Sequence, residues 1–214
     1  MTVRYEKFRR EYTSAGLTLG MLDACPLRQF EQWSEQAAAA DLDDPTAMVL
    51  ATLDEHGAPR QRIVLLKGLS QAGFVFYTNY NSDKALAIER EPRVSLHFPW
   101  NALDRQVIVA GVAQKTGSAE SAAYFASRPR ESQIAAWASR QSKPIDDRAA
   151  LERQAQRIRE KFGDDEIPRP AFWGGYEVLP QRIEFWQGGV HRLHDRFVYR
   201  RATQGEWEIE QLQP

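Results

Sequence analysis

The sequence contains a single cysteine, Cys25, among its 214 residues. One thiol cannot form a disulfide within the chain or complete a cysteine-based metal site, so neither is expected. This cysteine usage is typical of a reducing, cytoplasmic setting. Cys25 directly precedes Pro26 and has no evident base beside it, so a structural role is favoured over a role as a nucleophile.

Long apolar runs and an excess of charge are also lacking. No apolar run reaches the length of a membrane span, and the first twelve residues contain no apolar segment of the kind that secretory signals have. Lys and Arg number 28 against 29 Asp and Glu, which gives a net charge of -1. This balance argues against general binding to nucleic acid or to a membrane surface.

Several motifs that carry known chemistry are missing. The chain has no G-x-G-x-x-G, no G-x-x-x-x-G-K-[ST] and no H-E-x-x-H, and it has no G-x-S-x-G. His191 and His194 have a spacing that would suit zinc on a helix. The residues around them favour a strand, however, and no set of acidic or cysteine partners accompanies them, so no metal site is expected.

What is present is the material of a globular, mainly β protein of the α+β class. Hydrophobic residues make up 43% of the chain, with six Trp. Short β-favouring segments joined by tight turns predict an antiparallel meander or barrel with flanking helices. Helices are expected at 26–40, 83–90 and in three segments between 118 and 163, and strands at 47–54, 60–69, 74–79, 93–100, 105–115, 172–178, 182–187, 190–199 and 207–212.

Strands at both ends of the sequence bracket the helical middle, which predicts one barrel domain over residues 21–214. Residues 1–20 are polar and basic, and they are expected to form a mobile arm.

The stretch 185–201 is the densest in functional side chains. Gly188 and Gly189 predict a turn, and the β-favouring residues after them predict a strand over 190–199. On a strand Arg192, His194 and Arg196 would share one face, which is costly to bury without a partner. An anionic ligand is one interpretation, and an exposed strand face is the other.

Further clusters suit a phosphate. Arg62 and Lys67 stand at the two ends of an expected strand, where strict alternation would put them on opposite faces and surface cations remain an alternative. Thr78 and Lys84 flank the expected start of a helix, whose free N–H groups favour an anion. Tyr124, Arg128 and Ser132 are good phosphate donors and could converge at a helix corner interrupted by Pro129. Gln141 and Ser142 lie in a polar stretch that offers nothing to an apolar core.

These residues lie in segments that resemble the pyridoxamine/pyridoxine 5′-phosphate oxidases, a family of FMN-dependent enzymes. The similar segments follow the family order over nearly the whole chain. They are R-R-E-Y at 9–12, D-P-T-A-M at 44–48, Q-R-I-V-L-L-K at 61–67, F-Y-T-N at 76–79, R-V-S-L-H-F-P-W at 93–100, R-Q-V at 105–107, Y-F-x-S-R-P-R-x-S-Q-I at 124–134, Q-S at 141–142, F-W-G-G at 172–175 and I-E-F-W-Q-G-G-x-H-R-L-H-D-R at 183–196.

The resemblance implies a split β-barrel that binds FMN at the interface of a homodimer. It implies flavin contacts from Arg62, Ile63, Val64, Leu65, Leu66, Lys67, Tyr77, Thr78, Lys84, Gln106, Gln141, Ser142, Trp186 and Arg196. It implies substrate contacts from Lys67, Tyr124, Arg128 and Ser132 to the phosphate, from Arg192, Leu193 and His194 around the ring, and from Arg9, Arg10, Glu11 and Tyr12 on the arm. Arg192 and His194 are the implied catalytic residues.

The implied reaction is the oxidation of pyridoxamine 5′-phosphate or pyridoxine 5′-phosphate to pyridoxal 5′-phosphate by dioxygen, with release of hydrogen peroxide. Another split-barrel flavoprotein and a non-catalytic carrier are the alternatives. The chain departs from the family at Asp83, where members often have a basic residue, and at its C-terminus, which reads Q-L-Q-P where R-L-x-P is usual.

Overall fold

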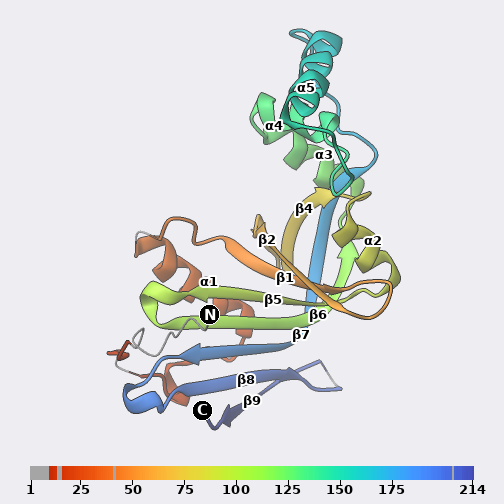
Figure 1. Ribbon diagram of the computed structural model, residues 1–214. Helices are drawn as coiled ribbons and strands as arrows, with labels where there is room; N and C mark the ends of the chain where they lie inside the picture. Colours follow the sequence, from red (N-terminus) through yellow and green to blue (C-terminus); the bar gives the residue numbers. More distant parts are fainter. Residues whose placement is uncertain (1–9, 14–15, 41, 204) are drawn as a thin grey trace. The chain divides into compact units, whose positions relative to one another are not determined.

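A computed structural model of the protein describes residues 10–13, 16–40, 42–203 and 205–214 (Figure 1). Its helices are α1 (Pro26–Ala39), α2 (Asp83–Arg90), α3 (Ser118–Ser127), α4 (Arg130–Ala138) and α5 (Arg148–Phe162), with short 3-10 turns η1 (Leu19–Met21), η2 (Asn101–Leu103) and η3 (Val190–Arg192). Its strands are β1 (Ala47–Leu53), β2 (Pro59–Leu65), β3 (Gly68–Leu69), β4 (Phe74–Asn79), β5 (Arg93–Trp100), β6 (Arg105–Lys115), β7 (Trp173–Gln187), β8 (Asp195–Arg201) and β9 (Trp207–Leu212).

The strands pair in the order β2-β1-β5-β6-β7-β4-β3, with β8 on β7 and β9 on β8. The pairs β3–β4, β4–β7, β7–β8 and β8–β9 are antiparallel. The expected antiparallel α+β fold is therefore confirmed. The chain divides into two units, and β1, β5, β6 and β7 contribute residues to both.

The first unit comprises Leu96–Ala110, Pro180–Pro214 and the described residues before Val49. Its core forms where α1 presents an apolar face, with Phe30 and Trp33 buried. Phe30 packs on Phe98 with ring centroids 4.7 Å apart, and Trp33 meets Phe185 edge-on at 5.1 Å. In the same unit β8 and β9 continue the sheet beyond the second half of β7 (Figure 1).

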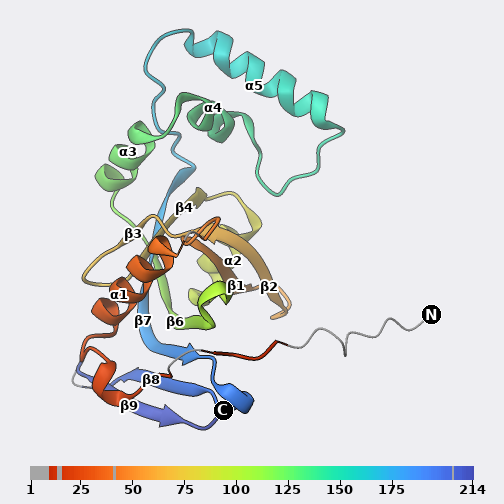
Figure 2. The same ribbon diagram turned by 90° about the vertical axis from the view of Figure 1, so that its left-hand side faces the viewer.

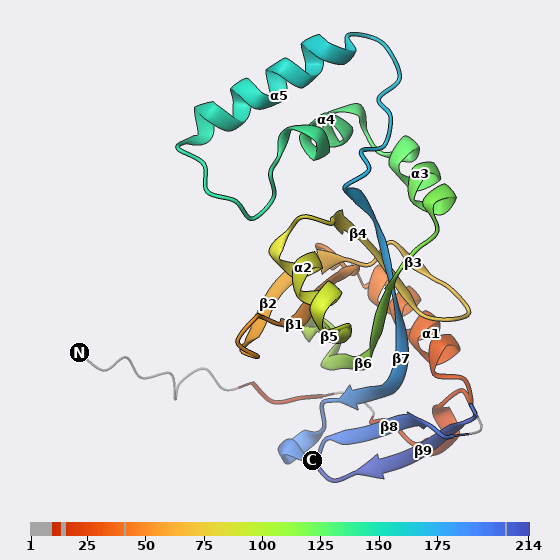
Figure 3. The same ribbon diagram turned by 90° about the vertical axis from the view of Figure 1, so that its right-hand side faces the viewer.

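The second unit comprises Val49–Ser95 and Gly111–Leu179. It holds β2 to β4, the first half of β7, α2 and the three helices α3, α4 and α5. Figures 2 and 3 show α5 alongside α4. The apolar cluster beneath these helices consists of Phe125, Ile134, Ile167 and Trp173.

Local sequence signals place several boundaries of the second unit where they were predicted. The Asp147 carboxylate accepts a hydrogen bond from the Ala150 N–H at the start of α5, and Gly163 ends the helix with a φ of 46°. At α3 and α4 the boundary moves by one residue. Gly117 occupies the cap position expected for Ser118, and Pro129 occupies the cap of a helix that begins at Arg130.

Four expected strands differ from the structure by more than one residue. The segment 60–69 is broken into β2 and β3, and the two expected strands at 172–178 and 182–187 are one continuous strand, β7. Pro180 is accommodated within β7 without ending it. The expected strand at 190–199 is wrong in its first half, because residues 190–192 form the 3-10 turn η3 and β8 begins at Asp195.

Candidate functional site

A cavity of about 400 Å³ in the second unit is lined by ten of the predicted side chains. It opens between the end of β2, strand β4 and the helices α3 and α4. The predicted residues that line it are Ile63, Val64, Leu65, Lys67, Tyr77, Thr78, Lys84, Tyr124, Arg128 and Gln141. Strand β2 ends at Leu65, so Lys67 lies beyond the strand and lines this cavity, whereas Arg62 lines a different cavity.

Lys84 is one of two cations held near each other in partly buried surroundings. It lies in the first turn of α2 with a fractional exposure of only 8%, and its ammonium group contacts the hydroxyls of Thr78 and Ser82, both at 3.3 Å. Burial, reinforced by the charge of Arg62, lowers the pKa of Lys84 to about 8. A buried ammonium next to a second cation favours an anionic ligand.

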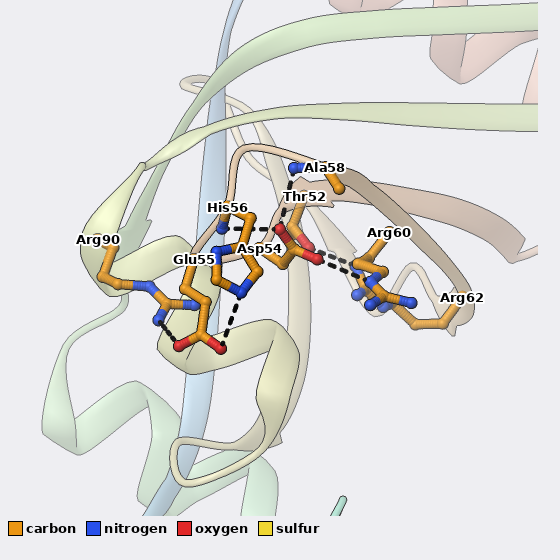
Figure 4. A network of polar contacts seen from close by, with 8 residues as sticks. All are labelled: Thr52, Asp54, Glu55, His56, Ala58, Arg60, Arg62 and Arg90. Carbon is orange, nitrogen blue, oxygen red and sulfur yellow. Dashed lines mark hydrogen bonds and ion pairs between the residues drawn. The ribbon is translucent and has the colours of Figure 1, made fainter.

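Arg62 is the second of these cations. Its Nη1 donates to Thr52 Oγ1 at 2.8 Å and to the Leu50 carbonyl at 3.1 Å. Figure 4 shows this contact beside the neighbouring pair of Arg60 and Asp54, whose charges are matched. Among the described residues Arg62 forms no ion pair with a carboxylate, and burial lowers its pKa.

Asp83 places a negative charge close to these cations. It begins α2, and its backbone N–H donates to Ser142 Oγ at 3.2 Å. Its carboxylate lies 3.9 Å from the ammonium group of Lys143. Arg62, Asp83 and Lys143 all line a second polar cavity of about 670 Å³ in this unit. Asp83 therefore partly neutralises the positive charge of Arg62 and Lys84.

Arg128 approaches the first cavity from the corner between α3 and α4. Its backbone is extended, with φ −73° and ψ 147°, as expected for a residue before proline. Burial lowers the pKa of its guanidinium group. Nη1 is buried and has no hydrogen-bond partner among the described residues. A buried donor without a partner is costly, and it fits a site that is completed by an anion.

Three aromatic rings form one wall of this cavity. Tyr77 and Tyr124 stack with centroids 3.9 Å apart and an interplanar angle of 16°. Trp173 lies nearly parallel to both rings, at 5.5 Å from Tyr77 and 6.2 Å from Tyr124. Burial and the neighbouring Glu120 raise the pKa of Tyr77 to about 12. Both tyrosines are thus neutral hydrogen-bond donors at physiological pH.

In the first unit the chain turns back on itself between Gly188 and His194, which corrects the expectation of a strand there. His191 and Arg192 have positive φ values of 55° and 64°. The Gly189 N–H donates to His194 Nδ1 at 3.1 Å. A Cβ atom on Gly189 would lie 1.9 Å from the Leu193 carbonyl oxygen, so this turn requires glycine. Arg192, His194 and Arg196 therefore do not alternate along one strand face.

His194 belongs to an aromatic cluster with Tyr12 and Trp186. The Tyr12 ring meets Trp186 edge-on at 5.7 Å and His194 at 5.3 Å, and the His194 and Trp186 rings are 4.6 Å apart. Burial, followed by the charge of Arg192, lowers the pKa of His194. His194 is accordingly neutral at pH 7, and its Nδ1 is the acceptor in the bond from Gly189.

The described part of the N-terminal arm is tied to this cluster. Arg10 forms an ion pair with Asp104 and donates to the Asn101 carbonyl at 2.8 Å. A cavity of about 420 Å³ in the first unit is lined by Arg10, Tyr12, Asn101, Asp104, Arg105, Gln106 and Trp186. Arg9, another predicted contact, lies outside the described residues.

Arg196 is held in the first unit by a buried carboxylate. Glu184 has an exposure of 3% and lies on β7 opposite β8. Its Oε1 accepts from Arg196 Nε at 2.8 Å, and its Oε2 from Arg182 at 2.5 Å. Gln106, in turn, contacts His97 Nε2 at 3.0 Å through its side-chain oxygen.

Some predicted residues stand apart from the cavities. Leu66, Ser132 and Ser142 line neither the first nor the second cavity, and Arg62 lines the second instead of the first. Leu193 is exposed on its turn. Sequence reasoning did not single out Trp173 or Ser139, which also line the first cavity. The F-W-G-G segment was the available signal for Trp173.

Within the described residues, no group of three or more His, Cys, Asp or Glu could hold a metal ion, and no helix is long and apolar enough to cross a membrane.

An antiparallel sheet with a cavity that combines unpaired cations and an aromatic wall defines a class of proteins that bind an anionic ligand. The comparison with known families gives the particular one. Residues 34–162 match the family described as pyridoxamine 5′-phosphate oxidase, and residues 173–214 match the pyridoxine 5′-phosphate oxidase C-terminal dimerisation region. The chain belongs to the pyridoxine/pyridoxamine 5′-phosphate oxidase family.

Curated relatives agree over almost the full length. The chain is 55% identical to the pyridoxine/pyridoxamine 5′-phosphate oxidase of Vibrio vulnificus strain YJ016, over 96% of this chain and 97% of that protein. It is also 55% identical to the enzyme of the same name from Escherichia coli strain K12 / DH10B, over 96% and 94%. These relatives identify the chain as an oxidase of this family.

Solved structures agree on the fold. PhzG from Burkholderia lata 383, solved in complex with tetrahydrophenazine-1-carboxylic acid, has a TM-score of 0.85 at 28% identity, covering 90% of this chain and 94% of that one. A pyridoxamine 5′-phosphate oxidase-related, FMN binding protein from Nostoc punctiforme has a TM-score of 0.72 at 18% identity, covering 90% and 100%. The second likeness bears on the fold alone.

Proposed function

We propose that the protein uses FMN and dioxygen to oxidise pyridoxamine 5′-phosphate and pyridoxine 5′-phosphate to pyridoxal 5′-phosphate. The observation that carries the proposal is the cavity of the second unit. Three of its cations, Lys67, Lys84 and Arg128, form no ion pair with a carboxylate among the described residues. A cavity that collects unpaired cations is suited to phosphate esters.

The residues present fit FMN. The pair of Lys84 and Arg62 supplies positive charge for a phosphate dianion, and the neutral hydroxyl of Thr78 suits a polar chain. Ile63, with an exposure of 71%, and Leu65 offer apolar surface to a flat ring system. When bound, FMN would accept two electrons and a proton from the substrate and pass the electrons to dioxygen.

The substrate phosphate is assigned to Lys67, Tyr124 and Arg128. Lys67 and Arg128 bring charge, and the neutral hydroxyl of Tyr124 brings a donor. These three contacts to the phosphate would hold the substrate ring in place, and less entropy would then be lost when the substrate reaches the reactive geometry. Ser132, in the first turn of α4, remains a predicted fourth contact.

His194 and Arg192 are assigned to the substrate ring. Because Nδ1 of His194 accepts from Gly189, the neutral ring carries its proton on Nε2. His194 would therefore orient the substrate as a hydrogen-bond donor. Arg192, held at positive φ on the same turn, would place its charge where negative charge develops during oxidation.

The protein is proposed to act as a homodimer in which both subunits contribute to one flavin site. The match of residues 173–214 to a dimerisation region supports this assembly. Under this proposal Gln106, Trp186 and Arg196 of the first unit also contact the flavin.

A visible absorption spectrum of the FMN-loaded protein tests the function. Anaerobic addition of pyridoxamine 5′-phosphate should bleach the flavin band, and air should restore it with one hydrogen peroxide and one ammonia released per turnover. Pyridoxine 5′-phosphate should give the same cycle without ammonia. A flavin band that is retained after both additions would contradict the proposal and would point to a different substrate or to a carrier.

A further inference from the structure

Arg128 is supported mainly by an aromatic face. The Cζ atom of its guanidinium group lies 4.7 Å from the centroid of the Trp173 ring and 5.7 Å from that of Phe125. Its Nη1 is buried without a hydrogen-bond partner among the described residues. No described carboxylate forms an ion pair with it, and the nearer of its two aromatic contacts is the indole of Trp173.

Trp173 is itself rigidly held at the start of β7. Its exposure is 6%, its N–H donates to the Pro170 carbonyl at 3.0 Å, and its own carbonyl accepts from Arg169. Phe125 meets its ring edge-on at 5.1 Å. A Cβ on the following Gly174 would lie 2.2 Å from the hydroxyl oxygen of Tyr80, so a larger residue there would displace the Tyr80 side chain.

A free arginine side chain samples many rotamers, and ordering it costs up to about 2 kcal/mol. Pro129 restricts only the backbone of Arg128. The flat indole face supplies the missing restraint, because a guanidinium group stacked on a ring keeps its N–H groups roughly parallel to the ring, where they remain able to bind an anion at the edge. The parallel rings of Tyr77 and Tyr124 extend the same wall.

We infer that Trp173 is a positioning residue for substrate recognition: it holds the guanidinium group of Arg128 in the orientation that grips the substrate phosphate. The inference rests on the proposed function, which assigns that phosphate to Arg128. Trp173 accordingly governs selectivity for phosphorylated over unphosphorylated pyridoxine compounds, and it acts through Arg128.

The test compares the binding of 4-deoxypyridoxine 5′-phosphate and 4-deoxypyridoxine, which have no oxidisable group at C4′, to the FMN-loaded protein by calorimetry. Phosphate selectivity is the dissociation constant of 4-deoxypyridoxine divided by that of 4-deoxypyridoxine 5′-phosphate. Trp173→Leu should lower this ratio about tenfold, within the range of a desolvated cation–π contact. Trp173→Phe, which retains a ring, should lower it only about two- to threefold.

Trp137→Leu is the matched control. Trp137 packs against the same apolar cluster and also lies beneath a cation, Lys161, at 4.8 Å. It does not line the first cavity. This variant should keep the parental selectivity ratio, which separates the effect on Arg128 from a general loss of packing.

A double-mutant cycle with Arg128→Met shows whether Trp173 acts through Arg128. In the Arg128→Met background, Trp173→Leu or Trp173→Phe should cause no further loss of selectivity. An unchanged ratio in Trp173→Leu, or an equal loss in the presence and absence of Arg128, would overturn the inference. Should Trp173→Leu fail to fold, the cycle with Trp173→Phe decides the question. A parental protein without preference for the phosphorylated compound would instead count against the proposed function.

Discussion

The ammonium nitrogen of Lys84 lies 3.3 Å from the hydroxyl oxygen of Thr78, in surroundings where the described residues offer it only neutral hydroxyls as direct partners. Removing a charge from water without a counter-charge is costly. The pKa of Lys84 falls to about 8 because of burial and the charge of Arg62, and Asp83 opposes the shift. The protein without its cofactor therefore retains an uncompensated charge at this point.

The stability of the cofactor-free protein should therefore rise with pH. The folded-state pKa of Lys84, about 8, lies below the ordinary lysine value of 10.5. Between these values the unfolded state binds more protons, so the free energy of unfolding increases as pH rises from about 8. We expect a gain on the order of 1 kcal/mol by pH 9.5. Urea unfolding measures it, and Lys84→Met should lack the rise.

The measurement ends at pH 9.5 because Tyr77 titrates higher. Its raised folded-state pKa, about 12, makes stability fall as pH passes above the ordinary tyrosine value of 10.0. Saturating FMN should abolish the rise between pH 8 and 9.5, since a phosphate dianion stabilises the charged lysine. A rise of equal size in Lys84→Met would show that another group causes it.

Asp83 should weaken FMN binding through its charge. Its carboxylate lowers the positive potential around Arg62 and Lys84 and lies 3.9 Å from Lys143. Asp83→Asn should tighten FMN binding about two- to fivefold at low ionic strength, because exposed charges interact weakly and are screened by salt. Flavin fluorescence quenching gives the dissociation constant.

Riboflavin, which has no phosphate, is the matched ligand for this variant. Its affinity should be the same for Asp83→Asn and the parent. If both flavins bind more tightly to the variant, the effect of Asp83 does not act on the phosphate and the electrostatic explanation fails.

Elements with strong local signals were predictable from the sequence. β4 and β5 have the predicted bounds, and α5 begins and ends at its polar cap and its glycine. The turn after Gly189 was not predictable, because Val190 to Leu193 carry β-favouring residues. There the close approach of Gly189 to the Leu193 carbonyl and the bond to His194 override the local preference.

The composition of the first cavity was largely predictable, because the resemblance names all three of its cations and both of its tyrosines. Trp173 was missed for a physical reason. A tryptophan in an apolar segment has the same pattern as a core residue, and only the three-dimensional contact with Arg128 distinguishes the two. The same holds for Glu184, whose two arginine partners become visible only when β7 pairs with β8.

Glu184→Gln should destabilise the protein strongly. Glu184 is buried and neutralises both Arg182 and Arg196. Removing one partner of a buried ion pair leaves uncompensated charge and costs about 3–5 kcal/mol; because both arginines are partly exposed, we expect the lower end of that range. Denaturant unfolding measures the loss. Glu210→Gln, which removes an exposed carboxylate near Arg200, should change stability by less than about 0.5 kcal/mol and serves as the control.

His194→Ala should lower turnover roughly tenfold, the value of one well-placed hydrogen bond, while the FMN content stays unchanged. His194→Asn separates two roles of the ring. Asparagine can still accept from the Gly189 N–H and so preserve the turn, but it lacks the Nε2 proton. If Nε2 orients the substrate, both variants have low turnover. Full turnover in His194→Asn would instead show that His194 serves only to hold the turn.

The pH dependence provides a second measure of the same role. Because burial and Arg192 lower the pKa of His194, the neutral ring predominates down to a pH below the ordinary value of 6.5. Turnover in the parent should therefore fall only on the acid side of that value, where the ring gains a proton and the bond from Gly189 to Nδ1 is lost. His194→Asn should lack this acid limb. Its persistence in that variant would assign the limb to a different group and remove the pH argument for His194.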